Sequence, residues 1–277
     1  MKIVVLVKQV PAISELQLDP VTHNLVRTGA PAMMNPVDKH AIEAALALKD
    51  AAGGGTVTIL TMGSESAADI MREGIAIGAN DGFLINDPAV KGSDTLATGK
   101  VLAKGVEKVG QVDVVITGRQ SADGDTGQIP PAVAERLGMN LLSYVQDLTF
   151  ANNTLTAVRK NCGGEETVAA PLPCVVSVME TSNTVRTPSL KGKMNAKKVV
   201  FPVWSIADIG LKPEEVGASG SATKVTELFM PEVHAQGVIV KGADEAAAVK
   251  ELASILRSKK VIYGVLIWLT WEMFGYT

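Results

Sequence analysis

Short apolar runs alternate with amphipathic stretches through residues 1–150, and this alternation constrains the fold more than any other feature. Such a pattern predicts βαβ units, which build a mostly parallel open sheet with flanking helices and therefore an α/β protein. In such a sheet the carboxyl ends of the strands meet at one edge, where ligands of open α/β folds bind. The expected strands are Ile3–Val7, Val57–Thr61, Phe83–Ile85 and Val112–Ile116.

Helical periodicity fills the gaps between these strands. The expected helices cover residues 35–50, 64–79 and 93–109. Asn35 is expected to cap the first helix and Pro36 to occupy its first position, because proline suits the first helical turn. Ser64 and Ser93 are expected to open the other two.

The pattern changes after residue 140. Short strands without intervening helices, at 142–150, 154–160, 166–170 and 174–178, predict an antiparallel extension. The irregular remainder, which ends in an amphipathic helix near Asp244–Arg257, is interpreted as a C-terminal partner-binding arm. We therefore expect an α/β nucleotide-binding domain at 1–179, a recognition loop and arm at 180–262, and an atypical tail at 263–277.

The tail, "YGVLIWLTWEMFGYT", is apolar, unlike the residues before it. It is too short for a membrane span, which needs roughly 20 apolar residues. Three interpretations stay open: a cloning or reading-frame artefact, a hydrophobic interface patch, or an aggregation hazard.

Composition narrows the possible functions. A net charge of -3 argues against a nucleic-acid surface, which needs clustered Lys and Arg. Two cysteines without a CxxC motif, and a start without a signal peptide, favour a reducing cytoplasm. The three histidines lack metal-ligand spacing, and no nucleophile or acid–base motif occurs, so we name no catalytic residue. Any redox chemistry would have to come from a bound cofactor.

The turn "GRQSADGDTGQIPP" follows the fourth strand, where α/β proteins commonly bind phosphate. It contains neither standard phosphate motif, but Gly124 and Gly127 permit positive φ and close backbone approach to an anion. Asp123 and Asp125 are expected to bind backbone amides or ribose hydroxyls. The helix that follows offers its positive amino end. Neutral donors are available from Ser121, Thr126 and Gln128. A merely solvated strand–helix turn remains the alternative.

Three other short stretches, "VKQV", "NPVD" and "TMG", adjoin strands and could line the same edge. Each alone is a weak signal, since Asn35 is more often only a cap and Met62 only core. Together they make a nucleotide pocket the leading hypothesis.

Six stretches in order give the chain a family resemblance. They are "VLVKQVP", "NPVDKHAIEAALALK", "REGIAIGAND", "SDTLATG", "GRQSADGDTGQIPPAVAERLG" and "VRTPSLKGKMNAKK". Over Met1 to about Ile262 the chain resembles an electron-transfer flavoprotein β subunit. The resemblance implies an adenine-nucleotide-binding fold, a heterodimer with an α subunit that the arm contacts, and an acyl-CoA dehydrogenase-type partner.

The resemblance also implies a set of nucleotide contacts. These are Leu6, Asn35, Pro36, Val37, Asp38, Met62, Ser121, Ala122, Asp123, Gly124, Asp125, Thr126, Gly127, Gln128, Ile129, Pro130, Pro131 and Ala132. The loop would hold the phosphates of an adenine nucleotide.

Three functions remain open. "DGDTGQIPP", "SDTLATG" and "DPVTHNLVRTGAP" are similar to the anaerobic, electron-bifurcating branch. That branch implies FAD reduced by NADH, with ferredoxin or flavodoxin as a low-potential acceptor. The first alternative is the housekeeping carrier, in which AMP replaces this FAD. The second is a stand-alone nucleotide-binding module. Whether the chain counts as an enzyme is left open.

The segment "TPSLKGKM" is similar to the family's partner-recognition loop. The resemblance assigns partner binding to Arg186, Leu190, Lys191, Lys193 and Met194. Leu190 would be the apolar anchor, and Lys191 and Lys193 would steer the approach of the partner protein. The alternative is an exposed leucine in a basic loop.

Overall fold

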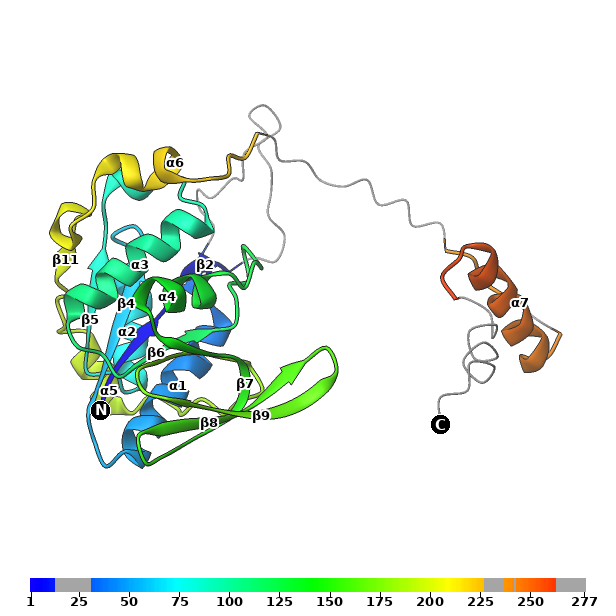
Figure 1. Ribbon diagram of the computed structural model, residues 1–277, viewed down its shortest axis with the longest axis horizontal. Helices are drawn as coiled ribbons and strands as arrows, with labels where there is room; N and C mark the ends of the chain where they lie inside the picture. Colours follow the sequence, from blue (N-terminus) through cyan, green and yellow to red (C-terminus); the bar gives the residue numbers. More distant parts are fainter. Residues whose placement is uncertain (13–30, 227–236, 242, 263–277) are drawn as a thin grey trace, which may run out of the picture. The chain divides into compact units, whose positions relative to one another are not determined.

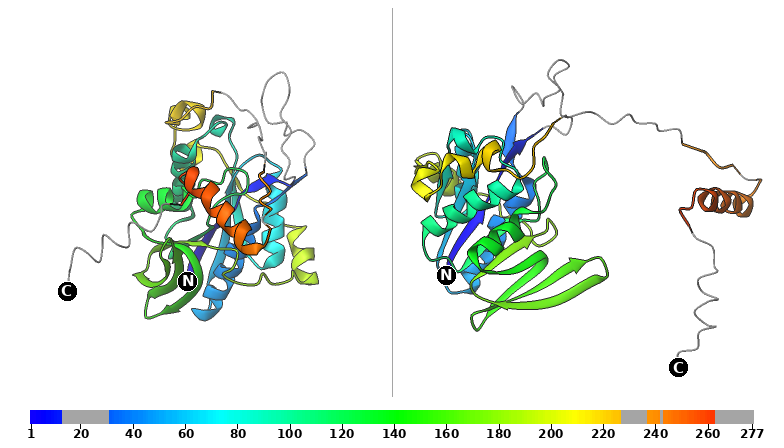
Figure 2. Two further views of the ribbon diagram at one scale, coloured as in Figure 1. Left: turned by 90° about the vertical axis from the view of Figure 1, so that its right-hand side faces the viewer. Right: turned by 45° about the horizontal axis from the view of Figure 1, so that its top comes forward.

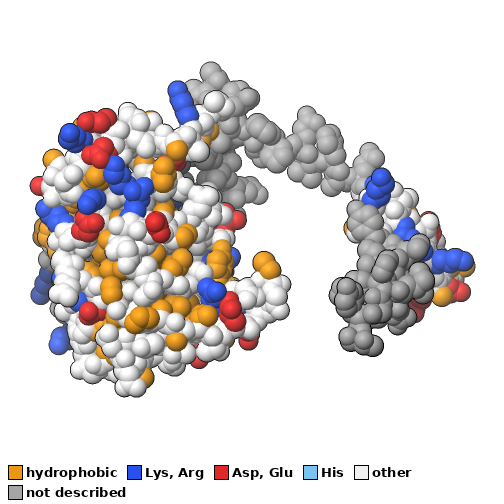
Figure 3. Space-filling model, viewed as in Figure 1, with side chains coloured by type: hydrophobic (Ala, Val, Ile, Leu, Met, Phe, Trp, Pro, Cys, Tyr) orange, Lys and Arg blue, Asp and Glu red, His pale blue; other side chains and the backbone are white. Residues whose placement is uncertain are grey.

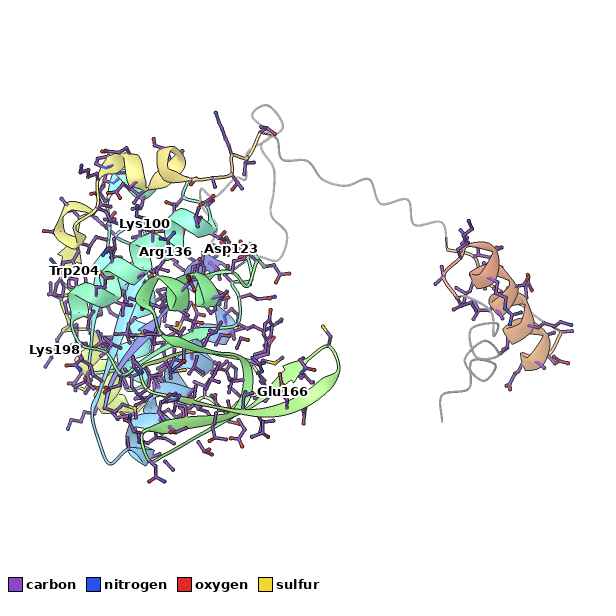
Figure 4. All side chains as sticks on the ribbon, in the orientation of Figure 1. Lys100, Asp123, Arg136, Glu166, Lys198 and Trp204 are labelled. Atoms are coloured by element: carbon purple, nitrogen blue, oxygen red, sulfur yellow. The ribbon has the colours of Figure 1, made fainter. Side chains whose placement is uncertain are left out.

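A nine-stranded sheet organises the first part of the chain, in the order β11-β5-β4-β1-β6-β10-β7-β8-β9. The computed structural model describes residues 1–12, 31–226, 237–241 and 243–262. The strands are β1 (Lys2–Leu6), β4 (Thr56–Met62), β5 (Asp81–Ile85), β6 (Val114–Gly118), β7 (Asn140–Ala151), β8 (Thr154–Asn161), β9 (Gly164–Pro171), β10 (Cys174–Val178) and β11 (Val203–Trp204). Trp204 on β11 and Glu166 on β9 mark its two edges (Figure 4).

The strands from β11 to β7 pair in parallel, which confirms the predicted α/β fold with a mostly parallel sheet. The four strands predicted from the apolar runs are present as β1, β4, β5 and β6, with ends shifted by one or two residues. Central strands of a parallel sheet are covered on both faces, so they tolerate continuous runs of valine and isoleucine. β6 is buried along its whole length, and β1 at four of its five residues.

Helices cover the two faces in pairs, so the sheet lies between two layers (Figure 1). The helices are α1 (Pro36–Ala51), α2 (Ala67–Ile77), α3 (Thr95–Val109) and α4 (Ile129–Leu137). Alternate strand residues face opposite layers: Ile3 and Val5 pack with α1 and α2, whereas Val4 and Leu6 pack with α3 and α4. The helices α2, α3 and α4 follow β4, β5 and β6, whose carboxyl ends lie at one edge of the sheet.

The helix starts differ in detail from the predictions. Pro36 is the first residue of α1 and Asn35 is at the cap position, but the Asn35 side chain makes no capping hydrogen bond. Ser93 does not open α3: Asp94 does, by accepting from the Ala97 N–H at 2.9 Å. Ser64 does not open α2 either, because that helix begins three residues later. Aspartate and serine are both good caps, so the sequence alone did not separate neighbouring candidates.

The assignment of 174–178 to the antiparallel extension is wrong. β10 lies between β6 and β7 and is parallel to both. Its five residues "CVVSV" are all buried, which suits a central parallel strand. Within the nine-stranded sheet, antiparallel pairing is confined to the later part of β7, β8 and β9. These strands project from one end of the sheet (Figure 2).

Shorter elements complete this part of the chain. They are the antiparallel pair β2 (Gln9–Pro11) and β3 (Ala32–Met34), the 3-10 turns η1 (Pro88–Val90), η2 (Ala207–Ile209) and η3 (Pro213–Glu215), and the helices α5 (Leu190–Ala196) and α6 (Gly217–Gly220). Trp204 stacks on Phe83 with 4.2 Å between ring centroids, which secures β11 to the sheet. Basic and acidic side chains are interspersed on the face shown in Figure 3.

The chain divides into two compact units, Met1–Leu228 and Phe229–Thr277. In the second, α7 (Glu245–Ser258) lies where an amphipathic helix was predicted, and Asp244 caps it. Val249 and Leu252 are exposed on it. The division at residue 179 and the partner-binding role of the arm stay predictions. The apolar tail at 263–277 lies outside the described residues.

Candidate functional site

The predicted nucleotide residues gather at the carboxyl edge of the sheet. Leu6 ends β1, Met62 ends β4, and the loop 119–128 follows β6. Since these strands run parallel in register, Leu6 lies beside both Leu60 and Thr117. The start of α1 brings in Asn35, Pro36, Val37 and Asp38, and the first turn of α4 brings in Ile129, Pro130, Pro131 and Ala132. The structure therefore brings together residues that are 126 positions apart in the sequence, from 6 to 132.

Asn35 joins the start of α1 to the loop. Its Nδ2 donates to the Gln120 carbonyl oxygen at 2.9 Å, and its Oδ1 accepts from the Ala122 N–H at 3.0 Å. The same Nδ2 also donates to Asp38 Oδ1 at 2.9 Å. This side chain is therefore committed to the loop backbone, which explains why it does not cap the helix.

Asp38 is the second buried polar group at this edge. Its Oδ2 accepts from the Lys8 N–H at 2.7 Å, so the carboxylate ties the segment that follows β1 to α1. Burial raises the pKa of Asp38 to about 7, although hydrogen bonds from Asn35 and from the backbone N–H groups of Lys8 and Gly118 act in the opposite direction. A Cβ at Gly118 would lie 2.5 Å from Asp38 Oδ1, so only glycine fits beside this carboxylate.

Lys8 adds a positive charge that the sequence analysis missed. Its Nζ donates to Asp123 Oδ1 at 2.6 Å and to Ser121 Oγ at 3.1 Å. Burial is the largest influence on Asp123 and acts upward, but the hydrogen bonds and charge of Lys8 prevail and hold the pKa of Asp123 below its ordinary value. Asp123 lies in the loop that leads into the amino end of α4 (Figure 4).

The expectation that Asp123 would bind a backbone amide or a ribose hydroxyl did not foresee Lys8. The signal was present in "VKQV", where a lysine directly follows a strand at the ligand edge. The loop sequence contains no lysine, but the fold places the Lys8 ammonium against it.

Two residues in the second half of the loop have positive φ. Gly127 has φ +62°, as predicted, but Gly124 does not adopt positive φ, and Asp125 does, at +50°. Among the described residues, none accepts a hydrogen bond from the backbone N–H of Thr126 or Gly127. Amides arranged in such a turn, just before a helix, attract anions.

Hydrogen bonds fix the ends of this half. The Asp125 N–H donates to the Ser121 carbonyl oxygen at 2.8 Å, and the Gln120 side chain donates to the Asp125 carboxylate. Thr95 Oγ1, at the start of α3, donates to Gln128 Oε1 at 2.6 Å. The "SDTLATG" stretch therefore contacts the loop directly.

The predicted partner-binding residues form a separate surface. Leu190 and Met194 on α5 are 77% and 55% exposed, and Lys191 and Lys193 are exposed beside them. A Cβ at Gly192 would lie 2.6 Å from the Ala76 carbonyl oxygen, so α5 packs closely on the end of α2. That end is the one nearest the amino ends of the strands, where the chain begins (Figure 1). The surface and the loop therefore lie at opposite ends of the sheet.

Arg186 has an internal role. It donates through Nε and Nη2 to the Glu43 carboxylate at 2.8 and 2.9 Å, and its backbone N–H donates to the same carboxylate. This pairing fastens the segment that precedes α5 to α1. The Arg186 side chain is still 40% exposed, and its assignment to partner binding stays a prediction.

Within the described residues, no helix is long and apolar enough to cross a membrane. The described part also contains no group of three metal-ligating side chains. Both cysteines are free: Cys162 is exposed and Cys174 is buried in β10.

Comparisons with known proteins agree on one family. The family model "Electron transfer flavoprotein domain" matches residues 22–209. The chain is 38% identical over 270 residues to the electron transfer flavoprotein subunit beta of Megasphaera elsdenii, covering 95% of this chain and 100% of that protein. It is 37% identical to the caffeyl-CoA reductase-Etf complex subunit CarD of Acetobacterium woodii, with the same coverage. The electron transfer flavoprotein subunit beta of Clostridium acetobutylicum is 39% identical over 90% of this chain and 95% of its own.

Proposed function

The chain belongs to the electron transfer flavoprotein family as a β subunit, and we propose that it binds FAD and accepts hydride from NADH for electron bifurcation. In this proposal it acts in a heterodimer with an α subunit. The bound flavin would pass one electron toward the α-subunit flavin and one toward a low-potential acceptor of the ferredoxin or flavodoxin type. The chain's own residues would bind and orient the cofactor.

The observation that carries the proposal is the shape and charge of the loop. Two backbone N–H groups, those of Thr126 and Gly127, have no partner among the described residues, and α4 begins two residues after them. Lys8 holds its ammonium 3.1 Å from Ser121 Oγ in the first half of the same loop. Amides at a helix start together with one lysine fit the phosphates of an adenine nucleotide. Asp123 would balance the charge of Lys8 whenever the site holds no anion.

A second observation supports the partner. The relative from Acetobacterium woodii is named as a subunit of a caffeyl-CoA reductase complex. We propose that this chain likewise serves an acyl-CoA dehydrogenase-type oxidoreductase, which would dock on the α5 surface. Leu190 would provide the apolar contact there, flanked by Lys191 and Lys193.

The test is cofactor analysis of the purified heterodimer. We expect two FAD per heterodimer and loss of flavin absorbance on adding stoichiometric NADH without any dehydrogenase. AMP in the extract, with no response to NADH, would reject bifurcation in favour of the housekeeping carrier. A colourless monomer that holds ATP would reject both and favour a stand-alone nucleotide-binding module.

A further inference from the structure

Asn35 and Asp38 are buried polar residues at the carboxyl edge, 1% and 4% exposed. Polar side chains are rarely buried unless hydrogen bonds satisfy them. Their position at the first turn of α1, beside the loop, raises the question of whether they contact a nucleotide or serve the protein alone.

The Asn35 side chain has both of its donors in use. Its two N–H bonds are directed to the Gln120 carbonyl oxygen and to Asp38 Oδ1, both at 2.9 Å. Its oxygen accepts from the Ala122 N–H. Because an amide side chain has only two donors, Asn35 has none left for a ligand oxygen.

The Asp38 carboxylate is equally committed. Oδ1 accepts from Asn35, and Oδ2 accepts from the Lys8 N–H at 2.7 Å. Gly118 lies against the carboxylate so closely that a Cβ would be 2.5 Å from Oδ1. Lys8, the start of α1 at 35–38 and the segment 118–122 therefore meet at these two side chains.

We propose that Asn35 and Asp38 are positioning residues, which hold the backbone of 118–122 in the shape that receives the nucleotide and do not touch the nucleotide themselves. The proposal rests on nucleotide binding at this loop, as set out above. It replaces direct contact, the role that family resemblance implies for their side chains, with an indirect one.

The substitutions Asp38→Asn and Asn35→Ala test it. In Asp38→Asn an NH2 group replaces one carboxylate oxygen and faces the donor from which that oxygen accepted, either Asn35 Nδ2 or the Lys8 N–H, so a buried polar group loses its partner. Asn35→Ala keeps the carboxylate and removes both bonds to the loop. In the nucleotide-depleted heterodimer, each substitution should raise the dissociation constant for AMP at least about tenfold, as expected from one buried hydrogen bond lost. Without nucleotide, each should also speed hydrogen exchange of the Ala122 amide by a similar factor.

Asp69→Asn is the matched control. Asp69 is likewise an acidic residue in a first helical turn, but its side chain is 77% exposed and pairs with Arg72 at 2.7 Å. Asp69→Asn should change neither the dissociation constant for AMP nor the hydrogen exchange of the Ala122 amide. If Asp38→Asn or Asn35→Ala does not fold, Gly118→Ala gives the same two measurements, because it displaces the carboxylate and removes no polar group.

The outcomes separate the proposals. Weaker AMP binding with unchanged exchange at Ala122 would mean that the side chains touch the nucleotide, which overturns the positioning role. Unchanged AMP binding would overturn it as well. If the unsubstituted heterodimer binds no AMP and retains no FAD, nucleotide binding itself fails, whereas the exchange measurement still tests the effect on the loop.

Discussion

At the scale of single residues, the loop depends on one glycine whose backbone conformation other residues rarely adopt. Gly127 has φ +62°, and a Cβ there would lie 3.3 Å from Tyr144 Oη. A β-branched residue in this conformation is strained by roughly 1–3 kcal/mol. We therefore expect Gly127→Val to lower nucleotide content sharply while circular dichroism still reports the sheet.

Gly138→Val provides the control. Gly138 has the same φ of +62°, but it ends α4 at the far side from the loop, and a Cβ there would meet nothing within 4 Å. Its substitution should cost similar stability and leave nucleotide content intact. Equal nucleotide loss in both variants would attribute the effect to strain on α4 and not to the loop.

Asp38 links folding to pH. The unfolded chain releases this proton near the ordinary value of 3.8, and the folded chain releases it near 7, so the folded state binds more protons between these values. The stability from this group is fully present below pH 4 and is lost as pH rises through 7. Relative to Asp38→Asn, the free energy of unfolding should fall by roughly 4 kcal/mol over this range. Urea unfolding of both proteins at pH 4 to 8 measures it, and a constant difference would contradict the buried titration.

Glycine permits positive φ without requiring it. Residue-scale prediction from the sequence was therefore right for Gly127 and wrong for Gly124. It missed the pairing of Lys8 with Asp123, since those residues are 115 positions apart and only the fold brings them together. For Asn35, the side chain had two possible uses, a helix cap or hydrogen bonds to the loop, and the structure shows the second.

At the scale of elements, one side of α5 is held against the protein and the other side is exposed. Gly192 packs on α2, Ser189 caps the helix by accepting from the Gly192 N–H at 3.0 Å, and Arg186 pairs with Glu43. A surface leucine on a rigid helix loses little entropy on binding, as expected of an interface hot spot.

Leu190→Ala should therefore weaken docking to the dehydrogenase by about 2 kcal/mol and leave cofactor content unchanged. The measurement is the rate of electron transfer at subsaturating dehydrogenase. Val200→Ala, which shortens an exposed apolar side chain outside α5, should have little effect. Unchanged transfer by Leu190→Ala would show that α5 is not the docking element.

Element types were predictable from periodicity, but neighbours in the sheet were not. The pattern of 174–178 correctly indicated a strand. Its place between β6 and β7 depends on pairing with β6, which is far away in the sequence, and a succession of short strands does not reveal such pairing. The continuous apolar run was the only clue, because an edge or antiparallel strand with one exposed face would alternate.

At the scale of the whole first unit, the two surfaces are separated by the length of the sheet. The loop lies at the carboxyl ends of the strands, and α5 lies beside the other end of α2. Substitutions at such distant sites usually act independently. Cofactor binding and dehydrogenase docking can therefore be altered one at a time, as the substitutions at Gly127 and Leu190 do.

The position of β10 also sets an order for synthesis. β6 and β7 are made first, yet neither contacts the other until β10 enters between them. A ribosome-bound chain that ends before Cys174 would present β6 as an open edge, and the β7–β9 meander would have no parallel neighbour. We expect such nascent chains to be cut rapidly by protease and to become resistant once residue 178 has left the exit tunnel. The centre of this sheet is thus completed late in synthesis, when β10 fills the position between β6 and β7.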